Sequence, residues 1–211
     1  MSDRRTLILQ AATRVIARRG VRGLRVEELA AEAKVSTALI YYHFGDRAGL
    51  MRRTLEFISE RAERHTEPSV SPRSDPRAHL EQMLLLELQD APTVRENSAA
   101  WGELRATAVF EPELREQLRD STYEWVEYAA GLIRRAQEAG TVDEDVIAAD
   151  SAERLTTLVE GLSERWLSGS TSLDRARELL RGAVASELPL PGRPGPAPAP
   201  TAGDRRTGAQ D

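Results

Sequence analysis

Cysteine is absent from this chain of 211 residues, and histidine occurs only three times. Without cysteine there are neither disulfides nor thiolate metal sites. His43, His65 and His79 do not have the spacing of metal ligands, so no metal site and no cofactor is expected. The chain also lacks an apolar run of about 18 residues and an apolar segment behind its N-terminal charges, so neither a membrane span nor a secretory signal is predicted. We therefore expect a cytoplasmic protein.

The whole chain has more acidic than basic residues, with a net charge of -5, but its N-terminal part has more basic than acidic residues. Residues 1–66 hold 13 basic and 8 acidic residues, whereas the remainder holds 16 basic and 26 acidic residues. This asymmetry is typical of a basic module that contacts phosphate, joined to an acidic body that does not. Basic helix surfaces that are simply solvated would give the same pattern, so charge alone leaves both interpretations open.

Strand-like alternation is absent as well, and helical periodicity takes its place. Helices are predicted over about 4–19, then as a short second helix around 26–33, over 37–42, and from 47 through Ile58. After a break at 66–76, which holds three prolines and three serines, helices resume at about 77–90, 94–110, 113–139, 146–168 and 172–187. The fold class is therefore all-α, with about nine helices.

Two short helices joined by the tight turn Lys34-Val35-Ser36 form a helix-turn-helix pattern. The second helix of such a unit lies in the major groove of DNA. Val35 and Ile40 are expected to face inward, while the residues expected to face outward are Ser36, Thr37, Leu39, Tyr42 and His43. Hydroxyls at a helix N-terminus suit phosphate contacts, and Leu39 suits a thymine methyl. The competing interpretation, that the aromatic residues are core, is favoured for Phe44 and partly for Tyr41.

The stretch from Thr6 to Leu50 resembles the DNA-binding domain of tetracycline-repressor-like (TetR family) regulators. The residues that carry the resemblance are Ala11-Ala12, Gly20, Leu29-Ala30, Val35-Ser36, Tyr41, His43-Phe44, Arg47 and Leu50. The resemblance implies an N-terminal helix-turn-helix domain at 1–47 and a helical ligand-binding and dimerisation domain at 48–188. It also implies phosphate contacts by Ser36, Thr37, Tyr41, Tyr42, His43 and Arg47, with positions 37–39 nearest the bases.

Three positions depart from the family pattern. Lys34 stands where the family usually has glycine, at a cost of roughly 1 kcal/mol if the backbone there is left-handed. Arg25 stands where a hydroxyl usually caps the second helix, and we expect it to add a phosphate contact. Ala38 and Leu39 replace a frequent glycine and a residue that is often polar, so base readout is expected to be sparse, with DNA shape contributing to specificity.

The body carries two long apolar stripes, at Ala148, Ala152, Leu155, Val159, Leu162 and Trp166 and at Leu173, Ala176, Leu180, Ala183 and Val184. By resemblance the last two long helices form a homodimer interface, and a dimer would read an inverted-repeat operator through two half-sites. An intramolecular core explains both stripes equally well. From 189 to 211 the chain is rich in proline, glycine and alanine, which predicts a disordered tail.

A small-molecule effector site is expected in the body, because most of the aromatic residues lie there. The candidate residues are Trp101, Arg105, Phe110, Tyr123, Tyr128 and Glu160. Aromatic residues at helical spacing are also typical of a core, and that alternative stays open for each. Residues 98–139 resemble regulators that sense choline-like or other small metabolites, which implies aromatic faces that hold a cation.

These observations favour a ligand-responsive DNA-binding regulator, released from its operator by an effector. An activator or a protein-interaction module on the same fold is the alternative. An enzyme is not expected, because the sequence offers no nucleophile, base or metal constellation, although fold never excludes function.

Overall fold

A computed structural model of the protein describes residues 3–66 and 75–192, and helices joined by short turns and loops make up most of these ranges. Over those ranges there are nine α-helices, one short 3-10 turn and no strand. The elements are α1 (Arg4–Gly23), α2 (Val26–Ala33), α3 (Thr37–Phe44), α4 (Arg47–Thr66), α5 (Pro76–Leu86), α6 (Pro92–Ala108), η2 (Pro112–Leu114), α7 (Arg115–Glu138), α8 (Ala148–Leu167) and α9 (Leu173–Glu187). The predicted all-α class is confirmed.

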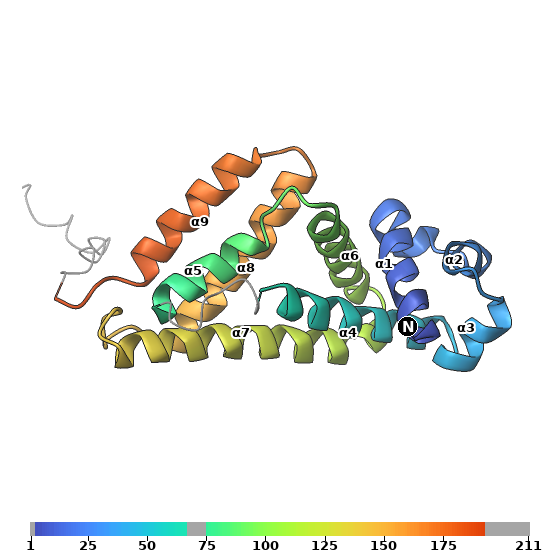
Figure 1. The fold of residues 1–211 in the computed structure, drawn as a ribbon, viewed down its shortest axis with the longest axis horizontal. Helices are drawn as coiled ribbons and strands as arrows, with labels where there is room; N and C mark the ends of the chain where they lie inside the picture. Colours follow the sequence, from blue (N-terminus) through green and yellow to red (C-terminus); the bar gives the residue numbers. More distant parts are fainter. Residues whose placement is uncertain (1–2, 67–74, 193–211) are drawn as a thin grey trace, which may run out of the picture.

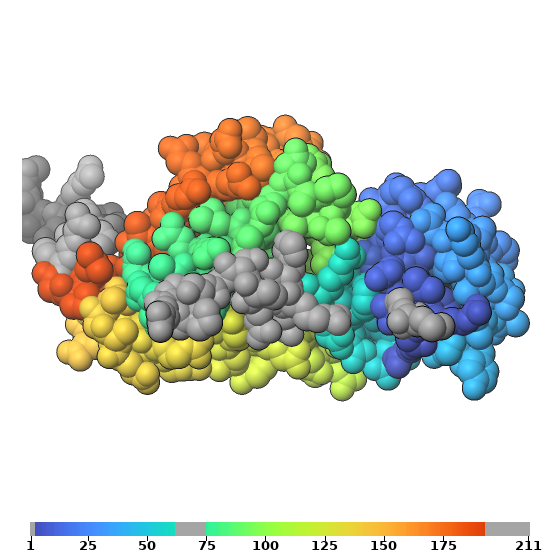
Figure 2. Space-filling view, in the orientation of Figure 1, coloured from blue at the N-terminus to red at the C-terminus, as the bar shows by residue number. Residues whose placement is uncertain are grey.

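The helices form an elongated molecule with α1, α2 and α3 as a lobe at one end (Figure 1). Helices α5, α7, α8 and α9 make up the other end, and α4 and α6 lie between the two, where they meet the lobe (Figure 2). One buried cluster joins α1–α3 to Leu50 and Leu55 of α4 and to Ala100 and Leu104 of α6. The N-terminal core therefore continues past residue 47, where we predicted the domain boundary.

The second buried cluster is formed by α5, α7, α8 and α9, and it contains the apolar stripes of the two last helices. Leu155 and Val159 of α8 and Leu180 and Val184 of α9 are at most 2% exposed within this single chain. The apolar stripes of α8 and α9 are thus part of the core of a single protomer, which is the second of the two explanations given for them. A dimer interface on these helices has to use their other faces.

The turn between α2 and α3 has a left-handed backbone at Lys34, with φ 54° and ψ 47°. Lys34 is the one residue other than glycine with a positive φ in the part of the chain described. The left-handed conformation lets the Val35 N–H donate to the Ala30 carbonyl at 2.9 Å, which closes the turn. The backbone at Lys34 is thus left-handed, which was the condition for the predicted cost. A lysine at this position costs about 1 kcal/mol relative to glycine.

Side-chain caps fix where α3 and α4 begin. The Ser36 hydroxyl accepts from the Leu39 N–H at 3.2 Å. The Asp46 carboxylate accepts from the Gly49 N–H at 2.6 Å and so caps the start of α4. A Cβ atom at Gly49 would lie 2.2 Å from the Phe44 carbonyl oxygen, so only glycine allows α4 to start this close to the end of α3.

Two predicted irregular segments lie partly outside the described residues. In the break at 66–76, residues 67–74 are outside, and α5 begins at Pro76 behind an Asp75 cap. In the tail predicted at 189–211, residues 193–211 are outside. The Pro189 carbonyl accepts from the Asp143 N–H at 3.0 Å, so the chain is still tied to the body where we predicted the tail to start.

Candidate functional site

The outer face of α3 is formed by the side chains that do not pack against the rest of the N-terminal lobe. Ile40 and Phe44 are buried against the lobe, and Val35 is half-buried, as the helix-turn-helix prediction requires. Tyr42 is 82% exposed and Tyr41 is 50% exposed, although large aromatic side chains are usually covered. Two exposed tyrosines on one short helix indicate a surface that meets a partner.

The other residues predicted to contact DNA lie around these tyrosines. The His43 ring packs edge-to-face on Tyr42, with ring centroids 5.3 Å apart. Ser36 is exposed at the start of α3, whereas Thr37 and Leu39 are half-buried in its first turn. Arg25 is exposed as the residue preceding α2, where it makes no side-chain cap hydrogen bond. Seven of the eight predicted residues thus belong to the helix-turn-helix surface or its edge, and their contacts with DNA remain predictions.

Arg47 is the exception, because its guanidinium is bound within the protein. Its Nη2 donates to the Val21 carbonyl at 2.7 Å, and its Nη1 lies 3.6 Å from a Glu111 carboxylate oxygen. These contacts tie the start of α4 to the end of α1 and to the segment after α6. Sequence reasoning placed Arg47 on a phosphate and missed this role, because the partners are distant in the chain.

A kink in α1 brings α6 into the same junction. Gly20 has φ 71° and ψ 168°, which interrupts the helix where we predicted its end, and one further turn runs to Gly23. The Val21 N–H donates to the Glu103 carboxylate of α6 at 3.2 Å. A Cβ atom at Gly20 would lie 2.7 Å from that carboxylate, so the absent side chain is what admits Glu103. The Val21 peptide therefore connects α1 to both α4 and α6.

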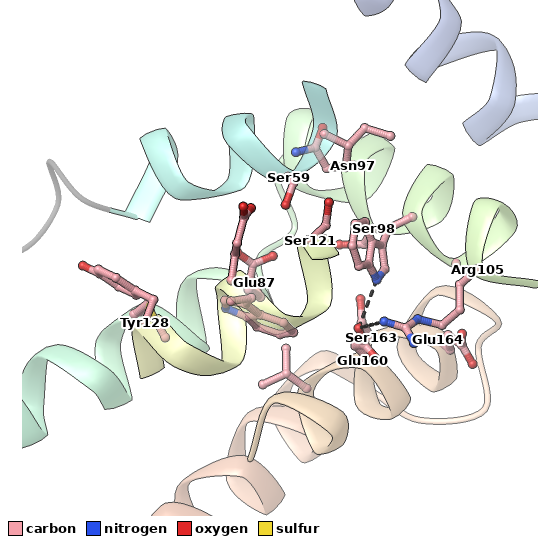
Figure 3. Close-up of a pocket in the computed structure, with 17 residues that line it drawn as sticks. Ser59, Glu87, Asn97, Ser98, Arg105, Ser121, Tyr128, Glu160, Ser163 and Glu164 are labelled. Carbon is pink, nitrogen blue, oxygen red and sulfur yellow. Dashed lines mark hydrogen bonds and ion pairs between the residues drawn. The ribbon is translucent and has the colours of Figure 1, made fainter. Parts of the chain in front are cut away.

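A cavity of about 440 Å³ opens between α4, α5, α6, α7 and α8 (Figure 3). Its lining residues are Ile58, Ser59, Met83, Glu87, Asn97, Ser98, Trp101, Gly102, Arg105, Ser121, Glu124, Trp125, Tyr128, Val159, Glu160, Ser163 and Glu164. The size suits a small molecule. Of the six residues predicted to bind an effector, the structure brings four together here, namely Trp101, Arg105, Tyr128 and Glu160.

Phe110 and Tyr123 do not line this cavity, so the structure does not bring them together with the other four candidates. Tyr123 is 64% exposed, because the cavity face of α7 follows Ser121, Glu124, Trp125 and Tyr128, a helical stripe that excludes position 123. Phe110 lies beyond the end of α6 and is 73% exposed, with its ring centroid 6.0 Å from the Arg22 guanidinium.

Sequence reasoning also missed several lining residues. Trp125, Glu87, Asn97 and Ser163 line the cavity but are not among the residues predicted to bind an effector. The usable signal was a polar residue in an otherwise buried helical stripe: Ser163 is 7% exposed, one position after the buried Leu162. Glu87 carried no such signal, because it lies just past the end of α5.

Glu160 anchors one side of the cavity through two neighbours on α6. Its Oε1 accepts from Trp101 Nε1 at 3.0 Å and from Arg105 Nη2 at 2.5 Å. The Arg105 guanidinium also lies 5.5 Å from the Trp101 ring centroid. Burial raises the pKa of Glu160, and the charge of Arg105 and the two hydrogen bonds oppose that rise. Its carboxylate is thus already committed to partners on the protein.

Glu87 faces the cavity from the side away from the Arg105–Glu160 pair (Figure 3). Burial raises the pKa of its carboxyl group to about 7. The side chain is partly accessible, and it lines the cavity. Three further polar atoms on the lining, Asn97 Oδ1, Arg105 Nε and Ser163 Oγ, are buried without a hydrogen-bond partner. Unpaired polar groups are costly in a protein interior, so these atoms are available to form hydrogen bonds with a molecule in the cavity.

Neither a metal nor a membrane is indicated by the described residues. In residues 3–66 and 75–192, no group of three or more histidine, aspartate or glutamate side chains is placed to hold a metal ion. No helix in these ranges is long and apolar enough to cross a bilayer.

Two sequence families match the two parts of the chain. Residues 8–54 match the tetR family of bacterial regulatory proteins, and residues 76–189 match the C-terminal domain of BetI-type transcriptional repressors. Among curated proteins, the transcriptional regulator BetI of Burkholderia mallei is 29% identical over 178 residues, covering 79% of this chain and 82% of the relative.

Solved structures agree with these matches. A TetR-family transcriptional regulator from Rhodococcus sp. is 44% identical, with a TM-score of 0.84, and the match covers 89% of this chain and 100% of that one. A transcriptional regulator from Saccharomonospora viridis in complex with choline is 27% identical, with a TM-score of 0.77, and the match covers 87% and 96%.

Proposed function

Because the chain belongs to the TetR family of DNA-binding transcriptional regulators, with a body of the BetI type, we propose that it is a repressor released from an inverted-repeat operator by an organic cation. The observation that carries this proposal is the position of α6. One side of α6 presents Trp101 and Arg105 to the cavity, and Glu103 on the same helix bonds the DNA-binding lobe. A ligand that shifts α6 therefore acts on both.

The DNA-contacting surface in this proposal is the outer face of α3. Tyr42, His43 and the hydroxyls of Ser36 and Thr37 contact phosphates, and Leu39 lies against a base edge. The high exposure of Tyr41 and Tyr42 supports this assignment. Arg25 adds a contact at the start of α2, whereas Arg47 reaches phosphate only by leaving Val21 and Glu111.

The dimer in this proposal forms through the faces of α8 and α9 that the protomer leaves uncovered. A shallow surface on α8 is lined by Leu158, Gly161 and Arg165, among others, and nothing lies within 4 Å of a Cβ atom placed at Gly161. Leu179 of α9 is 36% exposed. Small and apolar residues on neighbouring uncovered helix faces suit close packing against a second copy.

The effector class follows from the cavity lining. Trp101, Trp125 and Tyr128 supply aromatic faces, and four carboxylates line the cavity against the single positive charge of Arg105. Aromatic faces combined with negative charge attract quaternary ammonium groups. The choline held by the Saccharomonospora viridis regulator, which shares the fold, supports this class.

The first experiment is selection of bound sequences from a random duplex pool at moderate salt, with the purified full chain. We expect an inverted repeat to be recovered, and choline to weaken binding to it in a mobility-shift assay. Choline that strengthens binding would identify an activator or a co-repressed system instead. Failure to enrich any sequence, with the protein folded and unliganded, would contradict the proposal.

A further inference from the structure

The five charged residues on the cavity lining are in three different situations. Glu160 is paired with Arg105 and Trp101. Glu124 and Glu164 are exposed, so water solvates their carboxylates. Glu87 is both shielded from bulk water and without a hydrogen bond or ion pair among the described residues. It is therefore the carboxylate whose charge the unliganded protein leaves uncompensated.

The backbone around Glu87 also disfavours a negative charge on its side chain. Glu87 follows the last residue of α5 and keeps helical angles, φ -72° and ψ -15°, so its side chain lies at the negative end of the helix dipole. A carboxylate there is unfavourable even in water, and burial makes it more so. An acidic residue at a position with two influences that disfavour its charge is a candidate for a functional role.

We propose that Glu87 is the counter-ion for the positive charge of the effector, and that a cation entering the cavity displaces the proton of Glu87 wherever this carboxyl group is protonated. The inference rests on the proposed effector site and names the residue within it that binds the charge. The balance is simple: the carboxylic acid becomes a carboxylate paired with the cation, and its proton passes to solvent. No bond of the ligand is made or broken.

The pH dependence follows by linkage. Because the pKa of free Glu87 is about 7, the carboxyl is mostly protonated at pH 6 and mostly ionised at pH 8. A cation binds the ionised form better, so affinity rises about tenfold across this interval and levels off above it. The other ionisable groups around the cavity are His79 on α5, Arg105 on α6, Glu124 and Tyr128 on α7, and Glu160 and Glu164 on α8, while Arg177 of α9 donates to the nearby Leu88 carbonyl.

The test is calorimetric titration with choline and with its uncharged carbon isostere, 3,3-dimethylbutan-1-ol, at several pH values between about 6 and 8. For the unmodified protein we expect choline affinity to rise about tenfold with pH, with proton release visible as a dependence on buffer ionisation heat. The isostere is expected to show no such rise. In Glu87→Gln, choline affinity at high pH falls about tenfold or more and the pH dependence disappears.

Glu124→Gln is the matched control, since it makes the same chemical change at an exposed lining position and leaves the pH dependence in place. Choline binding that does not vary with pH, or that keeps its pH dependence in Glu87→Gln, would overturn the role of Glu87 and leave the proposed function intact. If choline and tetramethylammonium both fail to bind, the cation site itself is wrong, and both proposals fall.

A second measurement needs no ligand. A carboxyl whose pKa is raised from 4.5 to about 7 on folding holds a proton in the folded state that the unfolded chain has lost. The stability it contributes is complete below the unfolded pKa and is lost as pH rises through the folded one. The Tm of the unliganded protein should therefore fall between pH 5 and 8 relative to Glu87→Gln. Parallel Tm curves would contradict the inference.

Discussion

The DNA-binding lobe and the body differ in where their aromatic side chains point. In the lobe, α3 buries Ile40 and Phe44 and turns Tyr41 and Tyr42 outward. In the body, α6 and α7 turn Trp101, Trp125 and Tyr128 inward, onto a cavity. Aromatic residues thus serve an outer surface in one region and an inner surface in the other, so exposure by itself does not identify a functional aromatic residue.

The largest effect we expect is on the inner surface. Trp101→Ala removes an aromatic wall and the donor that pairs with Glu160, so choline affinity should fall about a hundredfold. DNA affinity without choline should change much less than choline affinity, because Trp101 lines the cavity and only packs against the edge of the buried cluster that contains the lobe. Tyr123→Ala, an exposed aromatic residue on α7, is the control for both measurements. An equal loss of DNA affinity in Trp101→Ala would mean that the two regions are not separable.

The reciprocal change lies on the outer surface. Tyr42→Ala should weaken binding to all duplexes by about tenfold and reduce the dependence of affinity on salt, as expected for a lost phosphate contact. Choline binding should be unaffected, and Tyr123→Ala again serves as the control. Competition between operator and unrelated duplexes measures the effect, and a loss confined to the operator would make Tyr42 a base reader.

The junction tests what connects the two surfaces. Glu103→Gln keeps the size of the side chain but weakens the bond to the Val21 N–H. We expect the affinity for choline alone and the affinity for operator DNA alone to change by no more than about threefold. The factor by which choline weakens operator binding should fall severalfold, because the coupling free energy between two such sites is typically only about 1–3 kcal/mol. Glu138→Gln, on the exposed end of α7, is the matched control. An unchanged coupling factor would show that the signal does not pass through this bond.

The smallest effect concerns the turn. Lys34→Gly relieves the left-handed strain and should raise the free energy of unfolding by up to about 1 kcal/mol, partly offset by the entropy of glycine in the unfolded chain. Ala38→Gly, at an exposed helical position in α3, should lower it by about 0.5–1 kcal/mol. Urea denaturation compares the two, and stabilisation by Ala38→Gly would contradict the backbone argument.

The two regions were also unequally predictable. The caps at Ser36 and Asp46, the left-handed turn and the buried face of α3 depend on residues within a few positions of one another, so the sequence contains them locally. The cavity depends on how five helices pack, and sequence periodicity does not set which helix faces meet. For this reason the sequence predicts Phe110 and Tyr123, which do not line the cavity, and does not predict Glu87, which does.

Arg47 shows the same limit from another side. A basic residue at the start of α4 fits a phosphate contact on local grounds, and its actual partners, Val21 and Glu111, lie 26 and 64 positions away in the chain. The interdomain junction could not be read from the sequence for this reason. Gly20 was noticed as a helix end, but the carboxylate that fills the space beside it was not.

The turn residue Lys34 has a practical consequence. It is the single lysine among 29 basic residues, and it is exposed on the left-handed turn next to α3. Every other basic side chain is arginine, which amine-reactive reagents leave unmodified. Among the side chains, a fluorophore that reacts with amines therefore marks one position, at the edge of the surface proposed to meet DNA. Once the α-amino group has been blocked, which its lower pKa allows, such a label reports operator binding and release without an engineered labelling site.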